Sequence, residues 1–198
     1  MDLQDFYDWL FNQRPDGTGI PLKGTGIVLG LLLIAFHLWA YLRADTVKGF
    51  AKSFPRHRGW GIGLLAFALV WTLFLIRHMD MADFHPWRQT LLMGLPVTWL
   101  LIVIYVPEFL SVRALGSLML LAASPVLHAA FLQPQTSRLL LPVLAYVWII
   151  AGMFLVGMPF LLRDWVQWVG DKSSRWTGAT LGGVVYGAVM LLAALLWY

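Results

Sequence analysis

The sequence contains no cysteine and few charged residues. Without cysteine, disulfide bonds, thiolate metal sites and cysteine nucleophiles are all excluded. Charged residues make up 12% of the 198 residues, about half of the roughly 25% found in soluble domains. Hydrophobic residues make up 60%, and the mean hydropathy is +0.73. A water-soluble fold of this size could not bury so much apolar surface, so the composition predicts an integral membrane protein.

The N-terminal residues lack the pattern of a secretory signal peptide, which requires a basic start and an uninterrupted apolar run. Three aspartates, at positions 2, 5 and 8, interrupt this region. The apolar residues between them recur at helical spacing on one face: Leu3, Phe6, Tyr7 and Leu10. We therefore expect an amphipathic helix within residues 1–16, lying at the membrane surface and ended by Pro15-Asp16-Gly17.

Six continuously apolar stretches are each long enough to cross a bilayer as a helix, which takes roughly 20 residues. They cover approximately residues 24–42, 59–76, 89–105, 108–131, 138–162 and 177–197. The predicted architecture is an all-α bundle of six transmembrane helices in one membrane domain over residues 1–198. Four prolines inside these stretches predict kinks, at Pro96, Pro125, Pro142 and Pro159. Pro107 predicts a tight turn between the third and fourth spans.

The distribution of Lys and Arg predicts the orientation in the membrane. Nine of them follow the first, third and fifth spans, and five lie on the opposite side. Because cytoplasmic loops are enriched in Lys and Arg, both termini are expected outside, in a cell membrane such as a bacterial inner membrane. The excess of four positive charges is then explained by orientation and by contact with the lipid bilayer, and nucleic acid is not expected as a partner.

The fourth span carries a polar stripe on an otherwise apolar helix. Four polar residues fall within roughly 60° of one another on a helix: Arg113, Ser117, Ser124 and His128. Lipid cannot satisfy such a stripe, so it should face protein or water. It could line a path for protons, ions or a small polar ligand. Alternatively, the serines could join helices by hydrogen bonds, and Arg113 could extend its side chain to the headgroups.

The segment "RHMDMADFHPWR", residues 77–88, is rich in groups that bind metals or protons. Its candidate ligands are His78, Asp80, Asp83 and His85. Imidazole and carboxylate groups suit zinc or another divalent first-row metal, and histidine also suits proton relay. The competing interpretation is a polar loop between two spans. Haem is disfavoured, because His37 and His128 are expected at different depths in the membrane.

The last span contains glycines four residues apart, a spacing that lets helix backbones approach closely. These are Gly178 and Gly182, and Gly183 and Gly187. Packing within the chain and packing against another membrane subunit both fit this spacing.

Three functional hypotheses follow from the sequence. The leading one is a small non-catalytic subunit or scaffold of a membrane assembly, since the loops are short and no catalytic motif is present. The second is a transporter or ion-conducting protein that uses the polar stripe. The third is an intramembrane enzyme, in which Ser124 and His128, four residues apart, would act together.

Overall fold

The computed structural model describes residues 2–12 and 19–198. These residues form nine α-helices and three short 3-10 helices, and they contain no β-strand. Six of the helices are long and apolar enough to span a membrane. The predicted all-α class and the six apolar helices are therefore confirmed.

The six long helices are α2 (Leu22–Leu42), α4 (Arg58–His78), α5 (Arg88–Tyr105), α6 (Leu110–Ala130), α7 (Leu140–Gly157) and α9 (Ser173–Leu196). The three shorter ones are α1 (Leu3–Phe11), α3 (Ala44–Ser53) and α8 (Phe160–Gly170). The 3-10 helices are η1 (Phe54–Arg56), η2 (Ala82–Trp87) and η3 (Thr136–Leu139). Each 3-10 helix precedes a long helix: η1 lies just before α4, η2 just before α5 and η3 just before α7.

The observed boundaries differ from the prediction most clearly at the fifth span. The helix ends at Gly157 rather than near residue 162, and Pro159 is the N-cap of a separate helix, α8. Pro159 thus separates two helices and does not kink a span, since proline is tolerated at a helix start. The segments 43–58 and 163–176, which lie between predicted spans and were expected to be short loops, contain α3 and most of α8.

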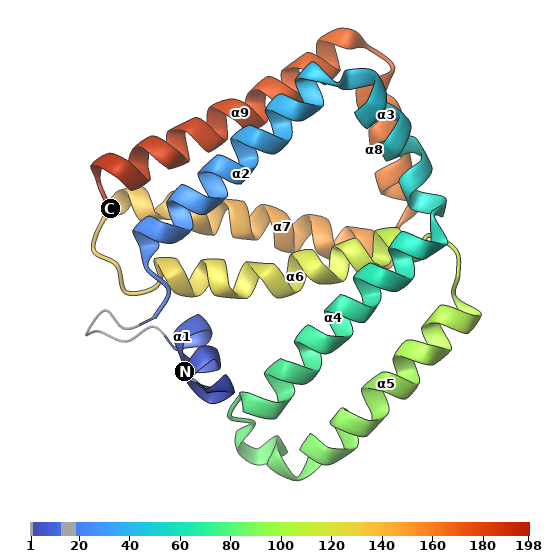
Figure 1. Cartoon of the computed structure of the whole chain (residues 1–198), viewed down its shortest axis with the longest axis vertical. Helices are drawn as coiled ribbons and strands as arrows, with labels where there is room; N and C mark the ends of the chain where they lie inside the picture. Colours follow the sequence, from blue (N-terminus) through green and yellow to red (C-terminus); the bar gives the residue numbers. More distant parts are fainter. Residues whose placement is uncertain (1, 13–18) are drawn as a thin grey trace.

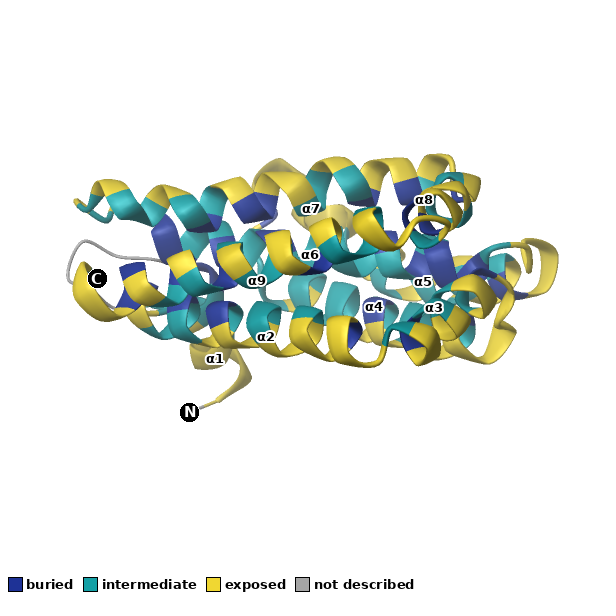
Figure 2. Ribbon diagram, turned by 90° about the horizontal axis from the view of Figure 1, so that it is seen from above, coloured by how far each residue is buried: buried dark blue, intermediate teal, exposed yellow. Residues whose placement is uncertain are grey.

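The long helices form pairs that diverge from one another (Figure 1). α2 packs along α9, and α6 packs along α7, while α4 contacts both α6 and α5. α3 and α8 lie side by side across one end of the molecule, which we call the α3–α8 end. α1 and both chain termini lie at the opposite end, the terminal end (Figure 1). Seen on edge in Figure 2, the molecule is flat, with exposed residues along both broad faces.

The main hydrophobic core lies where α2, α6, α7 and α9 meet, toward the terminal end. Its fully buried members include Ala129, Leu141 and Met190. Two tyrosines close this region: the hydroxyl of Tyr186 donates to the carbonyl of Leu140, and that of Tyr198 to the carbonyl of Ser137, both at 2.7 Å. These bonds satisfy polar groups that would otherwise be buried without a partner.

The N-terminal helix α1 forms as predicted but is shorter. A capping box starts it, because the Asp2 carboxylate accepts from the Asp5 amide and the Asp5 carboxylate accepts from the Asp2 amide. The helix ends at Phe11, whose side chain is buried, and it contacts α6 and α4. The predicted stop at residues 15–17 lies outside the described residues.

Candidate functional site

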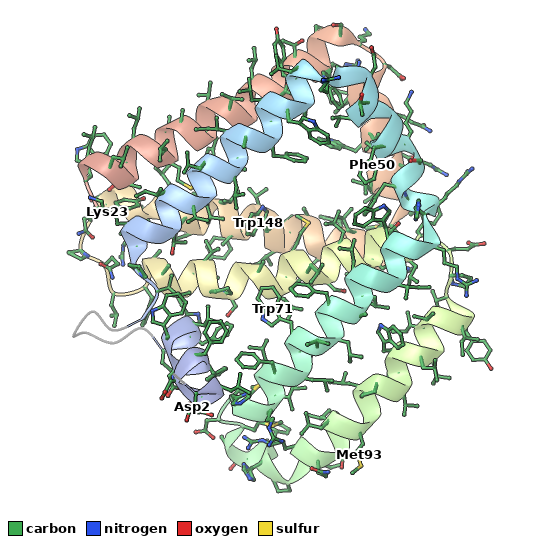
Figure 3. The ribbon with its side chains drawn as sticks, in the orientation of Figure 1. Asp2, Lys23, Phe50, Trp71, Met93 and Trp148 are labelled. Atoms are coloured by element: carbon green, nitrogen blue, oxygen red, sulfur yellow. The ribbon has the colours of Figure 1, made fainter. Side chains whose placement is uncertain are left out.

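α6 is the most enclosed of the long helices and carries the predicted polar stripe. Every residue from Leu110 to Ala130 is buried or partly buried. Of its apolar span, 39% is buried inside the chain, against 6% for the segment that contains α5. Side chains project into the spaces on either side of α6 and α7, where Figure 3 labels Trp71 and Trp148. Polar side chains on α6 are therefore surrounded largely by protein, which removes most of the cost of exposing them to lipid.

Arg113 and Ser117, the first half of the stripe, are bonded to backbone carbonyls. Nη1 of Arg113 donates to the carbonyl of Val156 near the end of α7, at 2.7 Å. The hydroxyl of Ser117 donates to the carbonyl of Arg113, one turn earlier on the same helix, at 3.0 Å. Arg113 thus joins the start of α6 to the end of α7. Its Nε is buried without a hydrogen-bond partner among the described residues.

Ser124 and His128, the second half of the stripe, lie close to α1. Nδ1 of His128 is 2.9 Å from the backbone carbonyl of Ser124, so the contact between them does not involve the serine hydroxyl. The His128 ring also meets the edge of the Phe11 ring, with centroids 5.8 Å apart. A serine activated by histidine requires a hydroxyl–imidazole bond, and this geometry does not provide one. His128 instead helps to hold α1 against α6.

The four candidate metal ligands of segment 77–88 are separated in the structure. His78 is partly buried and its Nδ1 is 2.8 Å from the carbonyl of Phe74, whereas Asp80, Asp83 and His85 are exposed. Asp80 accepts from the backbone amide of Ala82 at 3.0 Å. In residues 2–12 and 19–198, no three His, Asp or Glu side chains gather where they could hold a metal ion. The structure therefore gives no support to a metal site in this segment, which forms a polar turn closed by the bond from the Ala82 amide to Asp80.

Where the segment 77–88 meets α1, aromatic rings and carboxylate groups lie close together. The ring of Tyr7 on α1 stacks on that of His78, with centroids 6.3 Å apart. Burial raises the pKa of the Tyr7 hydroxyl above its usual value of 10.0, and the nearby carboxylates of Asp8 and Asp80 raise it further. The start of the polar segment thus packs against α1, through the contact of His78 with Tyr7 and the bond from the Gln4 side chain to the His78 carbonyl.

The four glycines of α9 divide into two classes. A Cβ on Gly187 would lie 2.9 Å from the carbonyl of Gly30, and one on Gly183 would overlap the His37 ring. These two glycines therefore let α2 approach α9. A Cβ on Gly178 or Gly182 would meet nothing within 4 Å, so neither glycine is used in packing within the described chain.

A groove lies between α5 and the rest of the bundle. Its volume is about 340 Å³, and its walls come from α4, α5 and α6 with Val156 of α7. We call it the α5 groove. Most of its lining is apolar, with hydroxyls at Thr72, Thr98 and Ser117, each donating to a carbonyl one turn back. The indole Nε1 of Trp99, also in the lining, is buried and has no hydrogen-bond partner in the described part of the chain.

Sequence reasoning missed several of these contacts. Gly26 and Gly30 are four residues apart in the first span, so the spacing used for α9 could have indicated them. Trp99 gave no such signal, because nothing in the sequence shows whether its indole N–H has a partner. Comparison of the chain with protein-family models, with curated proteins and with solved structures finds no match.

Proposed function

We propose that this chain is a non-catalytic subunit of a multi-pass membrane assembly, and that its α5 groove receives a transmembrane helix of a partner protein. The observation that carries the proposal is the buried indole N–H of Trp99, which lacks a hydrogen-bond partner within the described chain. A buried donor without an acceptor costs free energy, and about nine in ten such groups are satisfied in folded proteins. Because this nitrogen has almost no exposed surface in the chain alone, the side chains around it would have to move apart as a helix inserts, and a side-chain acceptor on that helix would then satisfy it.

The packing of α5 supports the same proposal. α5 contacts mainly α4, and only 6% of its apolar segment is buried, the lowest fraction of the six spans. Leu95 and Ile102 line the groove beside Trp99. The partner that fits is an apolar helix with a Ser, Thr, Asn or Gln side chain facing Trp99. Polar side chains of this kind join membrane helices by hydrogen bonds.

The bonding of the polar stripe favours a subunit over a transporter or an enzyme. Arg113, Ser117 and His128 are each bonded to a backbone carbonyl of the chain. A path for ions or polar solutes needs polar groups that face a hydrated cavity, and the lining of the α5 groove is mostly apolar. These bonds fit a role for the stripe in holding α6 to α7 and α1.

The charge distribution supports an orientation with the α3–α8 end in the cytoplasm. Among the described residues, this end has nine Lys and Arg residues and four Asp and Glu residues. The terminal end has four basic and five acidic residues in the same part of the chain. By the positive-inside rule, both termini would then face outward.

Native mass spectrometry of the protein, extracted gently from its own membrane, tests the proposal. We expect a partner chain at fixed stoichiometry. In the Thr98→Trp variant, the new indole fills the groove, and we expect at least a tenfold loss of the partner. Val97→Trp is the matched control, because Val97 is the preceding residue, is 58% exposed and does not line the groove.

Two outcomes would contradict the partner helix. A chain that is extracted alone, without a second polypeptide, would favour transport, and flux through Arg113→Ala should then be measured in liposomes. Equal retention of the partner by Thr98→Trp and Val97→Trp would show that the partner binds elsewhere. A homodimer that Thr98→Trp dissociates would identify the inserted helix as one from a second copy.

A further inference from the structure

The corner where α2, α3, α8 and α9 meet encloses a cavity. Its volume is about 420 Å³, within the range of roughly 300–1,000 Å³ that is typical of ligand sites. Val47 of α3 and Val166 and Val169 of α8 form one wall. α3 and α8 lie across the ends of α2 and α9 in Figure 1, as expected of amphipathic helices at a membrane interface.

The lining of this corner cavity is suited to a hydrocarbon chain. Several of its polar groups are already bonded within the chain: Nε1 of Trp176 donates to the carbonyl of Ala40 at 3.2 Å, and the Thr180 hydroxyl donates to the carbonyl of Trp176 at 2.9 Å. Nδ1 of His37 is 2.8 Å from the carbonyl of Leu33. A polar ligand would find few free hydrogen-bond donors or acceptors in this cavity, whereas an acyl chain requires none.

Basic side chains stand at the edge of the corner cavity. The Lys48 ammonium lies 5.1 Å from the centroid of the Trp176 ring, which lines the cavity. Lys52 follows one helical turn later on α3, so both ammonium groups lie on one face. Neither lysine forms an ion pair in the described chain. Lys52 also lines a small polar hollow together with Arg163, Gln167 and Asp171.

We propose that this corner binds one anionic glycerophospholipid from the surrounding bilayer. One acyl chain occupies the corner cavity, and the phosphate contacts Lys48 and Lys52. The excess of basic over acidic residues at this end complements the negative headgroup. The site is distinct from the α5 groove, which lies among α4, α5 and α6, so it does not depend on a partner helix.

The test uses the full chain in nanodiscs that contain equal amounts of phosphatidylglycerol and phosphatidylcholine. Native mass spectrometry then counts the lipids that each chain retains. We expect one phosphatidylglycerol per chain, retained in preference to phosphatidylcholine. Removing one lysine should lower this preference about fivefold, because one basic residue near an anionic surface contributes about 1 kcal/mol of binding free energy. The Lys48→Gln, Lys52→Gln double variant should lose it almost entirely, while Lys23→Gln at the terminal end should retain it.

A second variant tests the acyl-chain part of the site separately. Ala179 lines the corner cavity, so Ala179→Phe should displace the bound lipid without changing any charge. Leu181→Phe is the control, because Leu181 is 45% exposed and lies outside the lining. Equal retention of the two lipids by the unmodified chain would overturn the proposal. So would a preference that persists in the double lysine variant, or retention by Ala179→Phe equal to that of its control, provided that circular dichroism shows native helix content.

Discussion

The α2–α9 and α6–α7 pairs are packed tightly, whereas the α4–α5 pair is packed loosely. In each tight pair, two glycines face one another: a Cβ on Gly30 would lie 3.0 Å from the carbonyl of Gly187, and one on Gly116 would lie 2.8 Å from that of Gly152. In the loose pair, a Cβ on Gly63 or Gly94 would meet nothing within 4 Å. Both kinds of pair contain glycine, but only in the tight pairs do the glycines contact the partner helix. Such close backbone approach increases van der Waals contact between membrane helices.

This difference bears on function. A loosely held α5 leaves one side of the groove free, and the buried Trp99 indole faces no acceptor in the described chain. The tight pairs instead use their polar groups internally, as with the bond from Arg113 to Val156. In the subunit that we propose, the two tight pairs would form the rigid part and α5 the docking element.

The largest effect is expected from breaking a tight pair. In Gly116→Leu, the new side chain would collide with the backbone of α7 at Gly152, which cannot move aside as a side chain can. Overpacking of this kind typically costs about 1–3 kcal/mol of unfolding free energy, and we expect the upper end. Unfolding in detergent micelles, followed by circular dichroism as the fraction of SDS rises, measures the change. Gly94→Leu is the control, and since leucine has a higher helix propensity than glycine and meets open space there, it should raise stability by about 0.5 kcal/mol rather than lower it.

A smaller effect is expected where a glycine faces a side chain. Gly183→Ala would force the His37 ring away and break its bond to the Leu33 carbonyl, at a cost of about 1–2 kcal/mol. In a His37→Ala background, the same change should cost far less, because the ring is gone. Unfolding free energies of the two single variants and the double variant form a double-mutant cycle with a coupling of about 1 kcal/mol or more. Additive costs would show that the ring and Gly183 are not in contact.

Much of this architecture could be predicted from the sequence, because apolar runs of sufficient length have few alternatives in a membrane. The short amphipathic helices α3 and α8 were missed, since segments of mixed polarity resemble loops when only the length of apolar runs is considered. The fifth span was extended too far because Pro159 was assigned to a kink, whereas it starts α8.

The candidate site was harder to predict. The stripe on α6 was identified by helical periodicity, but the acceptor of Arg113 lies 43 residues further along the chain, at Val156. No local pattern indicates such a partner. His78, Asp80, Asp83 and His85 were grouped by their proximity in sequence, although the exposed turn separates them in space. Neither Gly116 nor Gly152 has a second glycine four residues away, and their contact depends on how α6 and α7 cross.

The loop after α6 offers a further test of a tight pair. Leu132 has a φ of 58°, in the left-handed region that costs a non-glycine residue about 1 kcal/mol or more. Its side chain is 53% exposed, so little packing is lost on truncation. We expect Leu132→Gly to raise the unfolding free energy by up to about 1 kcal/mol in the same micelle assay. The neighbouring Phe131→Gly, at a φ of −70°, should lower it instead.

The smallest effects are expected when the same substitution, glycine to alanine, is made once in the loose pair and once in a tight pair. Gly94→Ala places a methyl group in open space on α5, so the higher helix propensity of alanine should raise stability by about 0.5 kcal/mol. Gly187→Ala places the same methyl 2.9 Å from the Gly30 carbonyl, which outweighs that gain and should lower stability. Opposite signs in the micelle assay would show that backbone contact sets the tightness of each pair. If both variants were stabilised, helix propensity would dominate, and α2 would not be held to α9 by close approach at these glycines.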